Sequence, residues 1–138
     1  MPAASACPCG LGLPYDACCG PLHRGERLAP TAEALMRSRY AAYARGLVPY
    51  LVETLHPSRR APDEARRVRR SLQHTRWLGL CVLAVEGGSI LEATGVVAFE
   101  ATYEAGGRRG VMHERSRFVR EQGAWRYLDG EVAERDAP

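Results

Sequence analysis

The chain has 138 residues, of which 46% are hydrophobic and 25% charged, and its formal net charge is +3. This size and balance suit one domain with a real hydrophobic core and exclude a disordered chain. The basic residues are all arginine, and the small net charge gives little support for a nucleic-acid partner. No apolar run approaches the ~20 residues that span a membrane, and residues 1–6 lack the features of a secretory signal. We therefore expect a cytoplasmic protein without a membrane contact.

The N-terminal segment is rich in cysteine, glycine and proline and poor in large apolar residues. Four of the five cysteines lie here in the pattern C-x-C-x8-C-C, at Cys7, Cys9, Cys18 and Cys19. In a reducing compartment such a cluster favours a metal site over disulfides. Four thiolates suit zinc, with iron as the alternative metal, and they leave no open coordination position. We expect residues 1–28 to form a structural zinc knuckle and residues 29–138 a separate domain.

Three other interpretations of the cysteines are open. Cys18 and Cys19 can form a vicinal disulfide, the four thiols can be free, or His23 can replace one of the last two cysteines as a ligand. The metal site is preferred, because the disulfide ring is strained and so many free thiols in one short segment are prone to oxidation.

Three helices are expected next. The first begins after Thr31, a good N-cap, carries apolar residues at helical spacing and ends at Gly46. A second short helix begins near Pro49 and is stopped by His56-Pro57. The third begins at Pro62 and has a narrow apolar stripe among arginines.

The hydrophobic period then changes to two, which predicts strands over residues 77–86, 90–104, 110–120 and 125–129, separated by Gly-Gly and Gln-Gly turns. Three helices followed by a four-stranded meander indicate an α+β fold, with helices on one face of a curved antiparallel sheet. Cys81 lies in an apolar strand and is expected to be a buried small hydrophobe.

Glu114 is the second notable feature. On the third expected strand it shares a face with Ser116 and two apolar residues, while a histidine and two arginines mark the other face as the solvated one. A buried carboxylate is costly unless it is paired or hydrogen-bonded. We expect either a structural ion pair with Arg37 or Arg39, which is preferred, or a polar group in a cavity.

If there is a cavity, six residues are candidates for its lining: Tyr40, Tyr43, His56, Trp77, Glu114 and Ser116. The two tyrosines also fit the apolar stripe of their helix, and His56 can cap helix carbonyls instead of acting as a base.

The segment from Arg59 to Arg76 contains seven arginines. They form either a phosphate-binding face or a solvated helix face, and the second is preferred because no aromatic stacking platform accompanies them.

Two stretches carry a family resemblance. Cys7-Pro8-Cys9-Gly10 and Cys18-Cys19-Gly20 resemble the SEC-C metal-binding motif at the C-terminus of the SecA translocation ATPase. Nearly the whole chain is similar to the YchJ-type bacterial family of unknown function. Its most specific match beyond the cysteines is His113-Glu114-Arg115-Ser116-Arg117-Phe118.

This resemblance implies a zinc knuckle before a cone-shaped domain of the nuclear-transport-factor-like (NTF2-like) or cystatin-like fold. It implies no reaction, so no catalytic residue is carried over. It suggests SecB-like or ribosomal partners for the knuckle, although the loop Leu11-Gly12-Leu13-Pro14 replaces the usual Ser-Gly-Lys-Lys.

The sequence thus favours a zinc-binding accessory or adaptor protein, in which the knuckle docks to a partner and the cone is a scaffold or binds a small ligand. The alternative is a small-molecule enzyme that uses Glu114 or His56 as acid or base. RNA binding through the arginine-rich helix is a weaker alternative.

Overall fold

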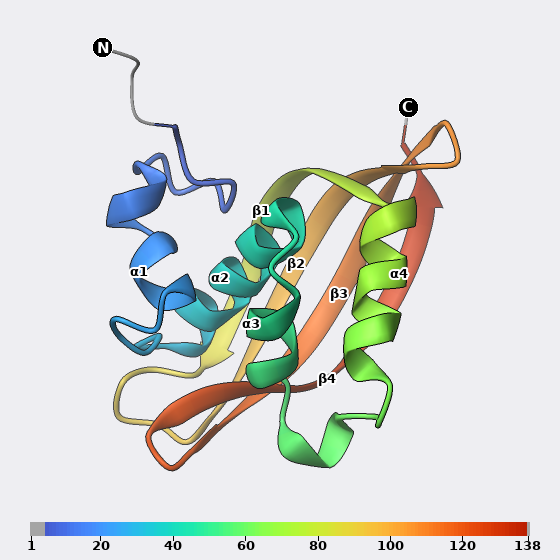
Figure 1. Cartoon of the computed structure of the whole chain (residues 1–138). Coiled ribbons are helices and arrows are strands. Elements are labelled where there is room, and N and C mark those ends of the chain that lie inside the picture. Colours follow the sequence, from blue (N-terminus) through green and yellow to red (C-terminus); the bar gives the residue numbers. More distant parts are fainter. Residues whose placement is uncertain (1–4, 138) are drawn as a thin grey trace.

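The computed structural model describes residues 5–137 as helices packed against one four-stranded antiparallel sheet (Figure 1). The helices are α1 (Gly20–His23), α2 (Ala32–Arg45), α3 (Val48–Glu53) and α4 (Glu64–His74), with short 3-10 helices η1 (Tyr15–Ala17) and η2 (Pro57–Arg59). The strands are β1 (Arg76–Gly87), β2 (Thr94–Ala105), β3 (Arg108–Glu121) and β4 (Ala124–Asp136). They pair in sequence order, so the predicted meander is confirmed.

The long helix α2 begins and ends as its capping residues predict. The Thr31 hydroxyl accepts a hydrogen bond from the Ala34 N–H at 3.0 Å. Gly46 adopts a left-handed conformation with φ of 74°, which ends the helix. One side of α2 lies on the concave face of the sheet, so it supplies both core and cavity residues.

Two strand boundaries differ from the prediction by more than two residues, and the others by one or two. Strand β2 begins at Thr94 and not at residue 90, because residues 88–93 form a longer connection. Strand β4 continues to Asp136 and not to residue 129, because β3 is long enough to pair with it over this whole length. A register shift beside Phe118 changes which residues of β4 face inward, and alternation counted along the chain cannot foresee it.

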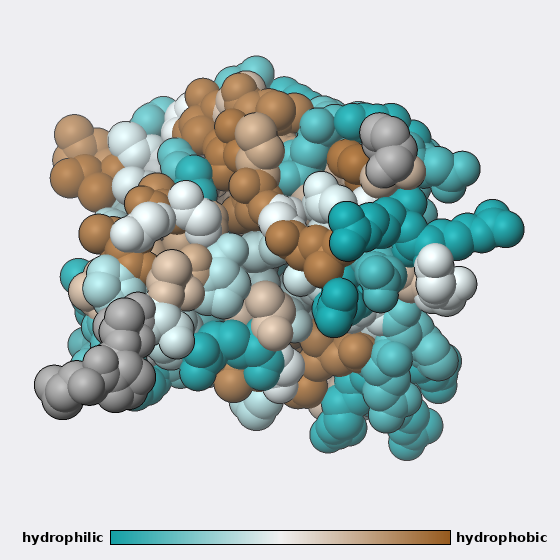
Figure 2. All heavy atoms as spheres, turned by 90° about the horizontal axis from the view of Figure 1, so that it is seen from above, coloured by the Kyte–Doolittle hydropathy of each residue, from teal (hydrophilic) through white to brown (hydrophobic). Residues whose placement is uncertain are grey.

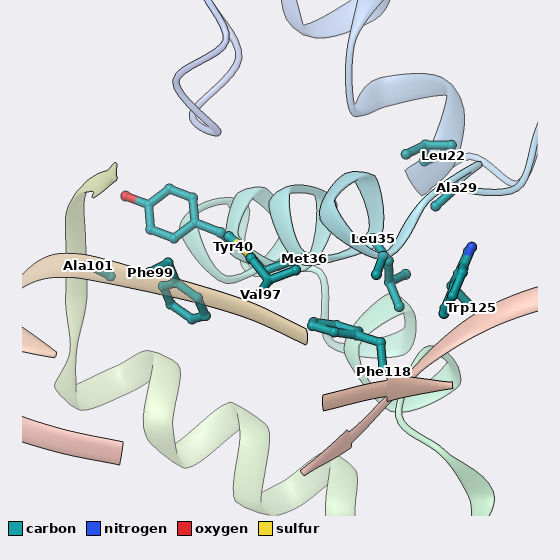
Figure 3. Close-up of a cluster of buried hydrophobic side chains, with 11 residues drawn as sticks. Leu22, Ala29, Leu35, Met36, Tyr40, Val97, Phe99, Ala101, Phe118 and Trp125 are labelled. Atoms are coloured by element: carbon teal, nitrogen blue, oxygen red, sulfur yellow. The ribbon is translucent and has the colours of Figure 1, made fainter. Parts of the chain in front are cut away.

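The hydrophobic core lies between α2 and the concave face of the sheet. Figure 3 shows these side chains meeting between helix and strands. Its buried members are Leu22, Ala29, Ala32, Leu35, Met36, Tyr40, Val97, Phe99, Ala101, Phe118 and Trp125. The indole N–H of Trp125 donates to the carbonyl oxygen of Pro30 at 3.3 Å and so ties the end of the linker to β4.

Cys81 is exposed, and the prediction of a buried side chain is wrong. Strand β1 is an edge strand with register shifts beside Trp77 and Val82. Cys81 pairs with Glu100 on the convex face of the sheet, which none of the described helices covers. The hydrophobic residues of β1 therefore do not all face the core, and Leu83 is 50% exposed.

The N-terminal knuckle packs against the side of α2 that faces away from the sheet. Its contacts include hydrogen bonds from Arg37 Nη1 to the Cys9 carbonyl oxygen at 2.8 Å and between His23 Nε2 and the Ser38 carbonyl oxygen at 2.7 Å. Ala41 is fully buried beneath the cysteines. In the described part of the chain, no helix has both the length and the apolar character needed to cross a membrane.

Candidate metal centre and ligand cavity

The four N-terminal cysteines converge on one buried point. Cys7 and Cys9 lie in a turn that the hydrogen bond from the Gly10 N–H to the Cys7 carbonyl oxygen closes, and Cys18 and Cys19 lie between η1 and α1. All four Sγ atoms lie within 4.8 Å of one another, and Cys9 Sγ is 3.4 Å from Cys18 Sγ. A tetrahedral zinc with Zn–S bonds of about 2.3 Å places its sulfurs about 3.8 Å apart, so the donor set fits such an ion.

The electrostatics of this cluster also favour a bound cation. Hydrogen bonds from neighbouring thiols, that of Cys19 foremost, lower the pKa of Cys9 to about 5 despite its burial. Burial and the hydrogen bond with Cys9 raise the pKa of Cys18 to about 12. The protein alone therefore favours the thiolate of Cys9 and disfavours that of Cys18, because like charges in a buried site repel. A divalent metal supplies the positive charge that the other thiolates need.

His23 does not belong to this donor set. Its Nδ1 is hydrogen-bonded to the Tyr15 hydroxyl, and its Nε2 to the Ser38 carbonyl oxygen. With both ring nitrogens engaged, His23 is a structural link between the knuckle and α2. The guanidinium of Arg45 lies 3.7 Å from the centre of the Tyr15 ring and adds a second link.

A cavity of about 330 Å³ lies between the helices and the concave face of the sheet. Its wall contains the aromatic residues Tyr40, Tyr43, Trp77, Phe99, Tyr103, Phe118 and Tyr127. Its polar and other residues include Met36, Arg39, Ser71, Thr75, Ala101, Met112, Glu114, Ser116 and Glu134. Five of the six residues that the sequence singled out therefore line one cavity, with His56 as the exception.

Glu114 is the polar centre of this wall. Its side chain is on the concave face, and the residue is only 8% exposed. Oε2 accepts hydrogen bonds from the hydroxyls of Ser116 at 2.5 Å and Tyr127 at 2.7 Å. No described residue donates to Oε1, and this oxygen is not sealed off by protein atoms. One carboxylate oxygen is thus fixed by the protein, and the other is available to a guest in the cavity.

The structure shows no ion pair between Glu114 and either predicted arginine. Arg37 pairs with Glu33 at 2.9 Å on the outer side of α2 and holds the knuckle. Arg39 Nη1 donates to the Leu51 carbonyl oxygen at 2.8 Å and to the Thr54 hydroxyl at 2.7 Å. The ion-pair expectation is wrong, because the arginine that reaches the cavity is bound to α3 and its C-terminal end.

Trp77 lies among three tyrosines on the opposite part of the wall. Its ring packs edge-on against Tyr40 and Tyr43, each at 6.2 Å between centroids, and against Tyr103 at 5.6 Å. Its indole N–H is buried and has no hydrogen-bond partner among the described residues. Burial raises the pKa of Tyr40 to about 12, so this phenol stays neutral.

His56 lies outside the cavity. Its Nδ1 is hydrogen-bonded to the Ser58 hydroxyl and accepts from the Ser58 N–H, where it caps η2, and its Nε2 pairs with Glu121. His56 therefore caps η2 and does not lie where it could act as a base on a guest in the cavity.

Two important residues were missed at the sequence level. Tyr127 holds the carboxylate of Glu114, and Gly130 lies so close to it that an added Cβ would be 2.9 Å from Glu114 Cδ. Tyr127 follows Trp125 at strand spacing, which was the available signal. The role of Gly130 depends on the register between β3 and β4 and could not be read from the sequence.

The arginine-rich helix α4 closes one side of a second, more open hollow of about 610 Å³. Arg59 and Arg67 line it, and Tyr43, Ser71 and Tyr127 are shared with the first cavity. Arg60 instead folds back onto the carbonyl oxygens of α3 and its C-terminal end. Arg60 therefore does not line this hollow, whereas the arginines of α4 itself are exposed, as a solvated helix face would be.

Comparisons with known proteins agree with this architecture. Residues 31–130 match the family model described as the YchJ, middle NTF2-like domain. A UPF0225 protein of Chromobacterium violaceum is 50% identical over 132 residues, which are 95% of this chain and 96% of the relative. One from Streptomyces coelicolor is 48% identical over 91% of this chain and 94% of its own.

A solved structure also matches. The solution structure of a SEC-C motif containing protein from Rhodopseudomonas palustris superposes with a TM-score of 0.85 at 40% identity and covers 94% of this chain and 99% of the other. The predicted NTF2-like fold with an N-terminal cysteine knuckle is thus confirmed. The chain belongs to the YchJ-type, or UPF0225, family of SEC-C motif proteins.

Proposed function

We propose that this protein binds a small molecule in the cone cavity and that a structural zinc ion in the knuckle stabilises the wall of that cavity. The observation that carries the proposal is Glu114, a buried carboxylate with one oxygen fixed by two hydroxyls and the other available to a guest. A buried charge without an ion-pair partner costs stability. A buried acid that faces a cavity is a candidate for binding a ligand there.

The size and lining of the cavity support a ligand of modest size. Binding pockets for small molecules have volumes of roughly 300–1,000 Å³ and combine apolar and aromatic walls with a few polar groups. The cone cavity, at about 330 Å³, lies at the lower end of this range. Its polar groups are few and separate, so they can fix the orientation of a guest.

The geometry of the knuckle supports a structural role for its metal. Four thiolates fill a tetrahedral zinc site and leave no position for a reactive water. The knuckle is bonded to α2 through Arg37 and Ser38, and α2 carries Met36, Arg39 and Tyr40 on the cavity wall. Zinc at the cysteines therefore holds one side of the cavity in place. Reduced thiols with this role suit a cytoplasmic protein.

The exposed loop of the knuckle favours a second function, docking to a protein partner of the SecB or ribosomal kind. Leu11 is 52% exposed and Leu13 46%. The surface carries further exposed hydrophobic side chains, and Figure 2 shows a group of hydrophobic residues beside hydrophilic ones on the face seen from above. Co-sedimentation of the zinc-loaded protein with ribosomes, and binding to purified SecB, test this role. A Leu11→Ser/Leu13→Ser variant that binds as well as the wild type would contradict it.

A fragment screen by ligand-observed NMR on the zinc-loaded chain tests the cavity. Ala101 is buried in the wall, so Ala101→Leu should fill part of the space and abolish fragment binding. Ala98 lies on the same strand but on the other face, and Ala98→Leu is the matched control. Fragments that bind the wild type and the control but not Ala101→Leu support the proposal. No binding to the wild type, or equal binding to both variants, would overturn it.

A further inference from the structure

We propose that the ligand of the cone cavity is a small organic cation, a protonated amine on an apolar body, held by Glu114 and the surrounding aromatic rings. This inference rests on the proposed small-molecule function and names the class of guest.

The first argument is the unused capacity of the Glu114 carboxylate. Its Oε2 already accepts two hydroxyl hydrogen bonds, whereas Oε1 has no donor among the described residues. No described arginine or histidine lies within ion-pair distance of this carboxylate. A guest that brings an N⁺–H donor supplies both the missing hydrogen bond and the missing positive charge.

The second argument is the aromatic wall. Tyr40, Tyr43, Trp77 and Tyr103 form one cluster of rings, and Tyr127 lies beside Glu114. Aromatic faces attract organic cations, and the attraction strengthens where water is excluded. The same rings provide the apolar contacts for the body of the guest. An anionic guest would lose this attraction and would also meet the charge of Glu114.

The third argument is the sum of charges in the wall. Glu114 and Glu134 are its acids, and Arg39 is its base. The guanidinium of Arg39 is bound to α3 and its C-terminal end through Leu51 and Thr54, and it lies 4.9 Å from the centre of the Tyr127 ring. Two carboxylates, of which that of Glu134 is exposed, against one guanidinium give the wall a formal charge of −1, which favours a positively charged guest.

Three probes of nearly equal shape test the class: benzylammonium, benzyl alcohol and benzoate. Binding is followed at pH 7 through the indole N–H signals of the intact zinc-loaded protein. Trp77 lines the cavity and reports on the guest, and Trp125, whose N–H is bonded to Pro30, is the internal reference. We expect benzylammonium to bind about tenfold more tightly than benzyl alcohol, because its charged N⁺–H group forms an ion pair with the carboxylate, whereas the alcohol donates only a neutral hydroxyl.

Two variants locate the effect. Glu114→Gln should reduce the tenfold preference to about twofold or less. Glu131→Gln changes the net charge equally but lies on the convex face opposite Arg115, so the preference should persist. The comparison of the three probes on the wild type needs no variant, so it decides even if Glu114→Gln does not fold.

The outcomes separate the two proposals. Benzyl alcohol or benzoate binding at least as tightly as benzylammonium would overturn the cation class, and so would a preference that survives in Glu114→Gln. If none of the three probes shifts the Trp77 signal while other fragments bind in the cavity, the class is wrong and the small-molecule function stands. If no fragment binds at all, both proposals fail.

Discussion

The hydrogen bond from the Tyr127 hydroxyl to Glu114 should stabilise the fold by a measurable amount. This amount should depend on whether the accepting group is charged. Tyr127→Phe removes the hydroxyl but keeps the ring, with its edge-on contact to Phe118 and the guanidinium of Arg39 above it. Hydrogen bonds to charged groups contribute about 1.5–3 kcal/mol and neutral ones about 0.5–1.5 kcal/mol. We expect Tyr127→Phe to cost about 2 kcal/mol in the wild type and about 1 kcal/mol when Glu114 is replaced by Gln.

The assay is a double-mutant cycle by urea denaturation of the zinc-saturated protein at pH 7, which should give a coupling energy of about 1 kcal/mol. Tyr40→Phe is the matched control, because Tyr40 lines the same cavity and its hydroxyl has no hydrogen bond to a described residue. It should change the free energy of unfolding by less than about 0.5 kcal/mol. If Tyr127→Phe costs no more than this control, or if the coupling is near zero, the assigned network around Glu114 is wrong.

Three further predictions concern the metal, the cavity wall and pH. Cys9→Ser should lose the metal in native mass spectrometry and unfold at a lower temperature, whereas Cys81→Ser should keep both properties. Gly130→Ala should cost about 1–3 kcal/mol by urea denaturation, because its Cβ would collide with the buried carboxylate, whereas Gly79→Ala has open space and should be much milder. Burial lowers the pKa of His23, so its neutral form stabilises the fold above pH 6.5, and this contribution is lost as the pH falls. The stability of the wild type relative to His23→Gln should therefore decrease from pH 7 to pH 5.5, and a constant difference would contradict this role.

The order of helices and strands could be predicted from the sequence, because helix caps and hydrophobic periodicity indicate the same elements that the tertiary structure contains. Thr31 and Gly46 bound α2 as capping rules require, and the change of period after residue 76 marks the start of the sheet. The far end of β4 could not be predicted, because four of the seven residues 130–136 are charged and the stretch pairs with β3 only through the long edge of that strand. Cys81 was misplaced because an edge strand with shifted register need not bury its apolar residues.

The inward position of Glu114 could be predicted from alternation along one strand, but its partners could not. Arg39 was one of the two arginines expected to pair with Glu114, but its guanidinium donates to the carbonyl oxygen of Leu51 in α3. This contact depends on where tertiary packing places α3, which the sequence does not reveal. The cavity itself is a product of sheet curvature and of the distance between α2 and α4, neither of which has a local sequence signature. The residue types of the third strand therefore predicted a buried polar site at Glu114, but only the structure reveals that this site faces a cavity.

The helix α2 connects the cysteine cluster and the cavity. Arg37, Ser38 and Ala41 face the knuckle, whereas Met36, Arg39, Tyr40 and Tyr43 face the cavity. These two sets alternate along two turns of one rigid helix, so a shift of the outer set displaces the inner set as well. A knuckle without metal would lose the compact loop that presents the Cys9 carbonyl to Arg37, and α2 would keep only its contacts with the sheet and α3. If the knuckle binds a metal and the cavity binds a ligand, as proposed, we expect metal occupancy and ligand affinity to be coupled through the packing of α2, and we expect the coupling to be reciprocal.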